Sequence, residues 1–248
     1  MNQNFWNIKA EKYPKAYDKD NIKSFNETMS RLKKLGVCFD HKKILDIGCG
    51  PGNYSILFAD LAAEVFGLDF SSEMIYYFSK QVKNSNIKNI FFEQALFEQW
   101  DCAGKYKYFD IAFASMTPAI KTEEDVIKME SLTKGDCVFI GWAGKRKNDI
   151  ADKVLLLHGI SPYMPKGFYN LKDILIKRKI KFKEEIFESS WNWRGDIEEA
   201  YRELSSRVRL EGKRPNRNLI VSFLKKEFPS DKVIMETQAL KGILVWKP

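Results

Sequence analysis

Short apolar runs alternate with amphipathic stretches along the chain, and this pattern predicts its secondary structure. Continuous apolar runs predict buried strands at positions 43–48, 64–69, 90–93, 109–115, 136–142, 181–188, 232–237 and 242–247. Helical spacing with capping signals predicts helices at positions 3–16, 20–35, 53–62, 71–83, 122–132, 147–159, 168–180, 195–211 and 216–227. Strands that alternate with helices indicate a doubly wound α/β fold, with a mainly parallel sheet and helices on both faces.

Three glycines stand at alternate positions between the first predicted strand and the helix that follows it: Gly48, Gly50 and Gly52. Glycine tolerates backbone angles that a Cβ forbids, and it lets a ligand lie against bare backbone. The amides at the following helix start favour a negatively charged ligand group. A dinucleotide fingerprint would need its third glycine at position 53, which is Asn53. The spacing therefore argues against a nicotinamide dinucleotide.

The run from Leu45 to Gly52, L-D-I-G-C-G-P-G, resembles motif I of the class I S-adenosylmethionine-dependent methyltransferases. A second segment fits the same family's pattern G-[apolar]-D-x-S-x-x-M, at positions Gly67, Asp69, Ser71 and Met74. The resemblance covers about residues 40–145. It implies S-adenosylmethionine as cofactor, and a seven-stranded sheet whose last strand is antiparallel. A Gly-rich turn in an unrelated α/β protein is the alternative.

The resemblance also implies roles for individual residues. Asp69, at the end of the second strand, would accept the ribose hydroxyls. Asp46 would orient the methionine amino group, or alternatively satisfy loop amides. Ala95 stands where the family often has an acid for the adenine amino group, although the Leu96 amide could still reach the ring. The expected cofactor-binding residues are Asp46, Gly48, Cys49, Gly50, Gly52, Asn53, Asp69, Phe70, Met74, Ala95, Leu96 and Ser115.

The segment Ser115–Ala119 corresponds to the family loop that faces the transferable methyl group. It lacks the [DN]-P-P-[YFW] motif, which disfavours methylation of adenine N6 or of glutamine. Ser115, Thr117 and Tyr13 are the catalytic candidates, and a simple turn at Pro118 is the alternative for the loop. Methyl transfer depends mainly on in-line placement of the nucleophile, so the lack of a catalytic histidine does not argue against an enzyme.

Aromatic residues gather outside these motifs. The aromatic side chains of the N-terminal segment predict that this segment folds over the cofactor as a lid, as it often does in the family. Lys145 or Arg146 could, like Arg194, pair with an acidic group of the acceptor. The expected acceptor-binding residues are Trp6, Trp142, Trp191, Trp193 and Arg194. Ordinary packing is the alternative for each tryptophan.

The net charge of +8 is unevenly distributed. Residues 1–140 carry a net charge of −1 and residues 141–248 carry +9. This basic part is either an electrostatic footprint for an anionic partner or a solvated surface. We expect one methyltransferase domain with a helical lid (1–40), a cofactor-binding core (41–145) and a basic, substrate-side part (146–248) that contains a helical insertion at about 190–230.

Four cysteines without a C-x-x-C pair, together with two histidines, indicate neither a disulfide framework nor a metal site. No apolar run approaches the roughly 20 residues of a membrane span, and the first residues lack the apolar stretch of a signal peptide. The cytoplasm is therefore the expected location. The sequence favours methyl transfer to a small molecule. The alternatives are a methyltransferase-like module that binds or modifies RNA, and a cofactor-binding domain without transfer activity.

Overall fold

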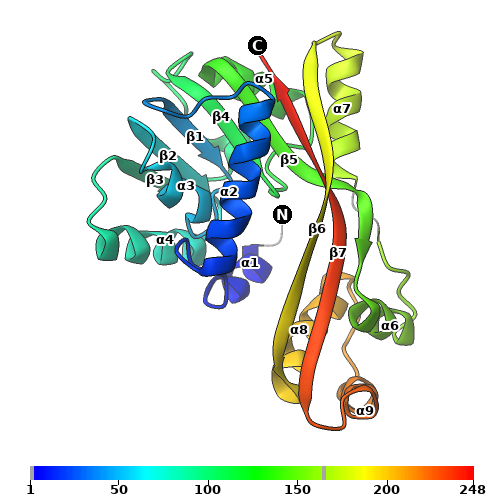
Figure 1. The fold of residues 1–248 in the computed structure, drawn as a ribbon. Coiled ribbons are helices and arrows are strands. Elements are labelled where there is room, and N and C mark those ends of the chain that lie inside the picture. Colours follow the sequence, from blue (N-terminus) through cyan, green and yellow to red (C-terminus); the bar gives the residue numbers. More distant parts are fainter. Residues whose placement is uncertain (1–2, 164–165) are drawn as a thin grey trace. The chain divides into compact units, whose positions relative to one another are not determined.

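The computed structural model describes residues 3–163 and 166–248, and the chain divides into two compact units (Figure 1). Unit 1 consists of Met1–Gly141, Gly167–Ile186 and Gly242–Pro248. Unit 2 consists of Trp142–Lys166 and Phe187–Lys241. The segment 167–186, part of the expected substrate-side region, belongs to unit 1, and the expected single-domain organisation stays a prediction.

Within the described residues, seven strands form one sheet in the order β3-β2-β1-β4-β5-β7-β6. The strands are β1 (Lys43–Ile47), β2 (Glu64–Asp69), β3 (Ile90–Gln94), β4 (Phe109–Ser115), β5 (Thr133–Lys147), β6 (Phe182–Asp196) and β7 (Lys232–Trp246). The pairs β1·β2, β1·β4, β2·β3 and β4·β5 are parallel. β7 lies between β5 and β6 and runs antiparallel to them (Figure 1). The predicted fold class, including the antiparallel last strand, is confirmed.

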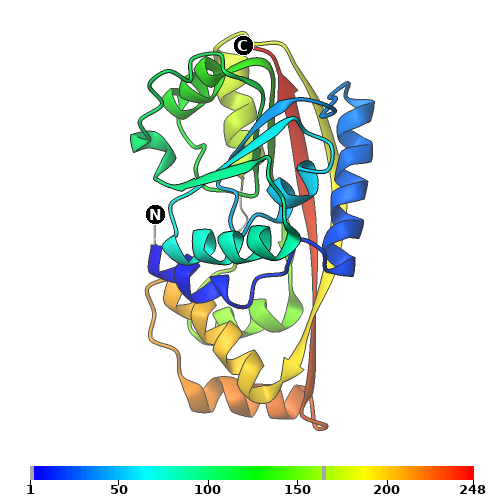
Figure 2. The same ribbon diagram turned by 90° about the vertical axis from the view of Figure 1, so that its left-hand side faces the viewer.

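Helices cover both faces of the part of the sheet that belongs to unit 1. Figure 2 shows α2 on one side, and α5 and α7 on the other. The helices are α1 (Gln3–Ala10), α2 (Lys19–Lys34), α3 (Asn53–Phe58), α4 (Ser72–Ser85), η1 (Phe97–Gln99, a 3-10 turn), α5 (Glu123–Leu132), α6 (Asp149–Leu157), α7 (Gly167–Lys177), α8 (Ile197–Leu210) and α9 (Arg217–Glu227).

The last three strands are longer than the sequence predicts. The prediction of two separate strands at 232–237 and 242–247 is wrong, because β7 is one continuous strand. Its alternation of exposed and buried residues runs unbroken from Lys232 to Ala239, and the residues between the two predicted strands continue the same strand. β6 continues to Asp196, where a capping box with Glu199 begins α8. Trp191 and Trp193 therefore lie on a strand and not after it.

A cluster of aromatic rings holds the first helices of unit 1 on the sheet. Phe58 of α3 is fully buried, and its ring centroid lies 4.8 Å from that of Phe39 and 5.1 Å from that of Phe113 on β4. Phe25 of α2 lies 5.5 Å from the same ring, and Tyr54 lies 5.8 Å from it. This packing fixes α3, and with it the glycine loop that precedes α3.

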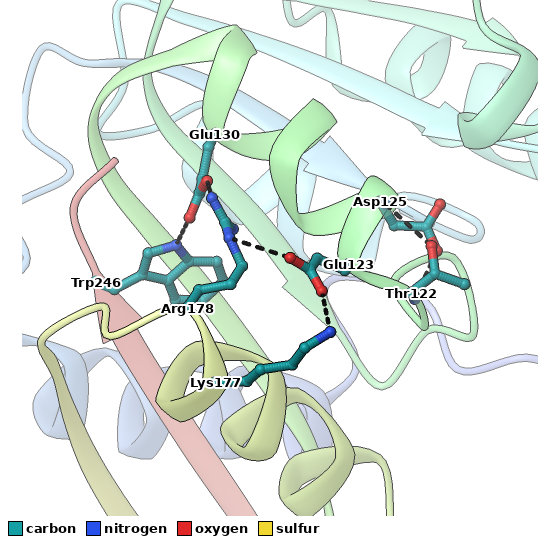
Figure 3. Close-up of polar contacts among 7 residues, drawn as sticks. All are labelled: Thr122, Glu123, Asp125, Glu130, Lys177, Arg178 and Trp246. Atoms are coloured by element: carbon teal, nitrogen blue, oxygen red, sulfur yellow. Dashed lines mark hydrogen bonds and ion pairs between the residues drawn. The ribbon is translucent and has the colours of Figure 1, made fainter.

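A buried ion pair on the other side of the sheet secures the end of β7 (Figure 3). Glu130 of α5 accepts hydrogen bonds from Trp246 Nε1, at 2.9 Å, and from Arg178 Nη2, at 2.8 Å. Glu123 of the same helix pairs with Lys177 at 2.9 Å. Residues from three distant parts of the sequence thus meet at one carboxylate.

No helix in the described part of the chain is long and apolar enough to cross a membrane.

Candidate active site

The glycine loop between β1 and α3 adopts left-handed backbone angles at all three glycines, with φ of +71° at Gly48, +56° at Gly50 and +87° at Gly52. A methyl group on Gly48 would overlap the side chain of Thr117, and one on Gly52 would overlap the ring of Phe78. At Gly50 the only described atom within 4 Å would be Met74 Sδ, at 3.9 Å. Gly48 and Gly52 are therefore required by packing, whereas a methyl group on Gly50 would make only an ordinary contact with Met74.

The amides of this loop are already bonded inside the protein. Those of Gly48 and Cys49 donate to the Leu68 carbonyl at 2.7 and 3.0 Å, and that of Gly52 donates to the Cys49 carbonyl at 3.1 Å. The Gly50 amide donates to Asp69 Oδ2 at 2.9 Å, and Pro51 has no N–H. A pyrophosphate would need several of these amides. The loop is thus built to accept a ligand that carries no phosphate there.

One face of α4 supports the whole loop. Met74 Sδ approaches Gly50, Phe78 lies against Gly52, and Gln81 Nε2 donates to the Pro51 carbonyl at 2.7 Å. Phe78 and Gln81 were not among the predicted site residues, although their spacing of four and seven residues from Met74 places all three on one helix face.

Asp69 ends β2 and is 8% exposed. Its Oδ2 accepts the Gly50 amide, and its Oδ1 accepts the Ser71 amide at 2.9 Å. Burial raises the pKa of Asp69, although these hydrogen bonds oppose the shift. Each carboxylate oxygen can accept a further hydrogen bond, so the contacts are compatible with the predicted ribose site, which stays a prediction.

Asp46, near the end of β1, is the second buried carboxylate of the site. Its Oδ2 accepts the Ser55 hydroxyl at 2.6 Å. Burial is the main cause that raises the pKa of Asp46 from 3.8 to about 7; the hydrogen bond from Ser55 opposes the rise, and the negative charge of Asp69 adds to it. Both carboxylates border the glycine loop, and their ionised forms favour a cationic ligand there.

Two further observations fit a bound cofactor at the loop. The side-chain Oδ1 of Asn53 is buried, and it has no hydrogen-bond partner among the described residues. A buried acceptor without a donor costs free energy, which a ligand N–H or O–H would recover. Gly50, where an added methyl group would contact only Met74 Sδ, leaves room beside it for such a ligand.

The segment after β3, Ala95 and Leu96, offers fewer groups to a ligand than the glycine loop does. The Ala95 amide donates to the Asp69 carbonyl at 2.9 Å, so it is not available to a ligand ring. Leu96 precedes the 3-10 turn as its N-cap and is half-buried. Cys49 is buried with its Sγ toward Gly67, so only its backbone can meet a ligand.

The loop after β4 carries backbone strain. Met116 has φ of +53°, which is unfavourable for a side chain of this size. Its amide donates to the Ile140 carbonyl at 2.8 Å. Thr117 Oγ1 accepts the Ala119 amide at 3.2 Å, and the Thr117 side chain lies against Gly48. Thr117 thus positions the glycine loop, while the catalytic role predicted for Ser115 and Thr117 stays a prediction.

The N-terminal segment lies against the loop after β2. Gln3 Nε2 donates to the Phe70 carbonyl at 2.8 Å, and the Ser71 hydroxyl donates to Asn7 Oδ1 at 2.6 Å. Further along, the Ala16 amide donates to Gln81 Oε1 at 3.0 Å. Trp6 is half-buried, edge-on to Phe5. These contacts are compatible with the predicted lid, which hydrogen exchange with and without cofactor would test.

Tyr13 lies near Asp69. Its side chain is 38% exposed, yet surrounding protein atoms desolvate the hydroxyl and raise its pKa, and the Asp69 charge raises it further. The phenol therefore stays protonated at neutral pH. It can donate a hydrogen bond or orient a substrate, but it is a poor general base.

Unit 2 contains the other predicted acceptor residues. The rings of Trp142 on β5 and Trp191 on β6 stack at 6.0 Å with an interplanar angle of 30°. Trp193 packs against the hydrophobic core of this unit. Strand alternation places Arg194 on the opposite face of β6 from Trp191. Two of the predicted residues are thus brought together, and two are not.

Unit 2 also has a polar cavity of about 250 Å³. Its lining includes Lys145, Glu188, Ser190, Glu236 and Gln238, from three strands. The tryptophan pair is not part of this lining. Lys145 and the two tryptophans therefore lie on different surfaces of the unit.

The methyltransferase domain family matches residues 39–206. Two curated relatives come from Bacillus subtilis. YqeM, whose name assigns it to the methyltransferases, is 35% identical over 86 residues, and the uncharacterized methyltransferase YcgJ is 25% identical over 87 residues. Each match covers 35% of this chain, and the chain spans about a third (34%) of the length of each relative.

Solved structures share the fold. YcgJ superposes with a TM-score of 0.56 and 14% identity, over 90% of this chain and 99% of its own. An S-adenosylmethionine-dependent methyltransferase from Aquifex aeolicus gives 0.53 and 14%, over 75% and 92%. Phosphoethanolamine N-methyltransferase 2 of Haemonchus contortus, in complex with S-adenosylmethionine, gives 0.54 and 17%, over 90% and 53%.

The glycine loop, the two carboxylates that border it and the sheet order agree with the family match over most of the chain. The chain belongs to the S-adenosylmethionine-dependent class I methyltransferases.

Proposed function

We propose that this protein transfers a methyl group from S-adenosylmethionine to a small-molecule acceptor in the cytoplasm. The observation that carries the proposal is the glycine loop, whose amides are satisfied internally while Gly50, beside two carboxylates, is uncrowded by side chains other than Met74. That arrangement suits a cationic ligand that carries no phosphate. The small-molecule acceptor is supported by the Haemonchus contortus neighbour, whose name states such an acceptor.

S-adenosylmethionine supplies an electrophilic methyl group on a sulfonium. In the proposed site, Asp69 accepts the ribose hydroxyls and Asp46 attracts the methionine amino group. The buried Asn53 Oδ1 accepts a hydrogen bond from the ligand. Tyr13 and the strained loop at Met116 orient the acceptor, and the lid excludes water.

Calorimetry with S-adenosylmethionine and NAD tests the cofactor preference. We expect S-adenosylmethionine to bind and NAD not to bind. Gly50→Ala should weaken S-adenosylmethionine binding about tenfold or more, because the added methyl group occupies the space of the ligand. Binding of NAD alone would refute the proposal.

Gly104→Ala is the matched control. Gly104 also has a positive φ, of +73°, and a methyl group there would meet no described atom within 4 Å. Both variants therefore carry similar backbone strain, and only the change at Gly50 should alter affinity. Transfer of label from the cofactor to small metabolites would support the proposed acceptor class, whereas transfer to RNA would favour the RNA-modifying alternative.

The cofactor affinity should depend on the charge of Asp46. Its folded-state pKa of about 7 lies above its ordinary 3.8, so the folded apo protein holds this proton more tightly than the unfolded chain. The contribution of Asp46 to the stability of the apo protein therefore falls as pH rises from about 4 to about 7 and is level above that range. Binding of the cationic cofactor should instead tighten with rising pH, because it favours the carboxylate.

Between about pH 6 and about pH 7.5 we expect affinity to increase by at most about tenfold per unit, the limit for one proton. Asp46→Asn should remove this dependence. Protonation of the cofactor itself affects binding to the wild type and to the variant equally. The ratio of the two affinities therefore reports only the effect of Asp46 ionisation. A constant ratio across this range would contradict the role assigned to it.

A further inference from the structure

Two hydrogen bonds attach the N-terminal segment, residues 3–16, to α4, against which α1 packs (Figure 2). At the start of α4, the hydroxyl of its N-cap Ser71 donates to Asn7 Oδ1 at 2.6 Å. Towards the other end, Gln81 Oε1 accepts the Ala16 amide at 3.0 Å. Since Gln81 follows Ser71 by ten residues of helix, the two attachments lie about 15 Å apart.

The attachment at Ala16 is a fixed point of unit 1. Ala16 is fully buried, and its carbonyl accepts a hydrogen bond from Asn21 Nδ2 at 3.0 Å. The turn around it is closed by the Lys15 amide, which donates to Asp18 Oδ2 at 2.8 Å. A buried amide without an acceptor would cost free energy, so Gln81 is needed where Ala16 lies.

The other end of the same side chain holds the glycine loop. Gln81 Nε2 donates to the carbonyl of Pro51, between Gly50 and Gly52, at 2.7 Å. A backbone carbonyl only accepts and a backbone N–H only donates, so the reversed side-chain amide would satisfy neither partner. One glutamine therefore links the N-terminal segment to the loop, with both of its polar ends in use.

Between its two attachments, the N-terminal segment passes close to Asp69. Tyr13 lies near enough for the charge of Asp69 to raise its pKa, after the larger effect of burial. Asp69 in turn accepts the Gly50 amide and the Ser71 amide. The two loops that hold this carboxylate are thus the same two that the segment reaches, one through Gln81 and one through Ser71.

We infer that Gln81 is a positioning residue for S-adenosylmethionine, which ties Pro51 to Ala16 so that ordering of the glycine loop by the cofactor also orders the N-terminal segment. This inference rests on the proposed function, in which that segment closes over the cofactor. Gln81 acts without touching the ligand. Because its bonds hold the loop in place beforehand, less conformational freedom is lost when the cofactor binds.

Gln81→Glu tests the link, because a carboxylate of the same shape keeps the acceptor for Ala16 and loses the donor for Pro51. Calorimetry should show an affinity for S-adenosylmethionine about three- to tenfold weaker, as expected for one neutral hydrogen bond. Hydrogen exchange should show that the wild type gains protection over residues 3–16 when the cofactor binds. The variant should keep the protection of the apo protein and lose this gain.

Gln81→Met removes both contacts and should lower the protection of residues 3–16 in the apo protein as well. The matched control is Asn84→Asp, which converts an exposed amide of the same helix to a carboxylate. It should leave the affinity within about twofold and the gain in protection unchanged. A new negative charge by itself attracts a cationic cofactor, so weaker binding to Gln81→Glu is not a charge effect.

A gain in protection that survives Gln81→Glu, or affinities within twofold of the wild type for both Gln81 variants, would overturn the inference. Wild-type protein that binds S-adenosylmethionine without any gain over residues 3–16 would refute the coupling and leave the cofactor assignment intact. Wild-type protein that does not bind S-adenosylmethionine would refute the proposed function, and the positioning role with it.

Discussion

Replacing Asp69 by alanine should weaken S-adenosylmethionine binding by about 1.5–3 kcal/mol, the range for hydrogen bonds to a charged group. The structure adds a second cost, because the variant also leaves the Gly50 and Ser71 amides without their acceptor. These amides hold the glycine loop beside the end of β2. We therefore expect the apo protein to lose thermal stability as well.

Calorimetry and thermal unfolding of the same variant separate the two effects. Asp60→Ala removes an exposed carboxylate just after α3 and should leave the affinity within about twofold of the wild type. If Asp69→Ala lowers the melting temperature but leaves the affinity unchanged, Asp69 organises the loop and does not hold the ribose.

Replacing Glu130 by glutamine should lower the free energy of unfolding by about 3–5 kcal/mol, the range for breaking a buried ion pair from one side. Its side chain is 9% exposed and pairs with Arg178. The amide keeps one acceptor for Trp246 or for Arg178, but it removes the charge that balances the guanidinium (Figure 3). Denaturant unfolding measures the change.

Glu124→Gln, on the exposed side of the same helix, is the control, with an expected change within about 0.5 kcal/mol. Combining Glu130→Gln with Arg178→Leu should recover part of the loss, because the second change removes the unpaired charge. A midpoint for Glu130→Gln equal to that of the wild type would show that the ion pair is not important for stability.

Local sequence determined the cofactor-binding half of the fold. The predicted strands at 43–48, 64–69 and 109–115 agree with the structure within one residue, because their apolar runs are buried on both faces and end at clear turn signals. The tight turn at the three glycines was also predictable from the sequence, since left-handed backbone angles exclude most other residues.

The reason for each glycine came only from the tertiary structure. Gly48 is required by Thr117 and Gly52 by Phe78, across 69 and 26 positions of the sequence, while Gly50 has room for a methyl group beside Met74. No local pattern distinguishes the three. The internal bonding of the loop amides likewise depends on Leu68 and Asp69 of the neighbouring strand.

Unit 2 shows the same limit of local information. The sequence indicated tryptophans and basic residues that could meet an acceptor, but β6 and β7 proved longer than their apolar runs because polar residues alternate along their exposed faces. Strand pairing then brought Lys241 to Trp142 and Trp191, and placed Arg194 on the opposite face of β6 from Trp191. Composition determined the charge and aromatic content of this unit, whereas the pairing of strands far apart in the sequence decided which of those side chains meet.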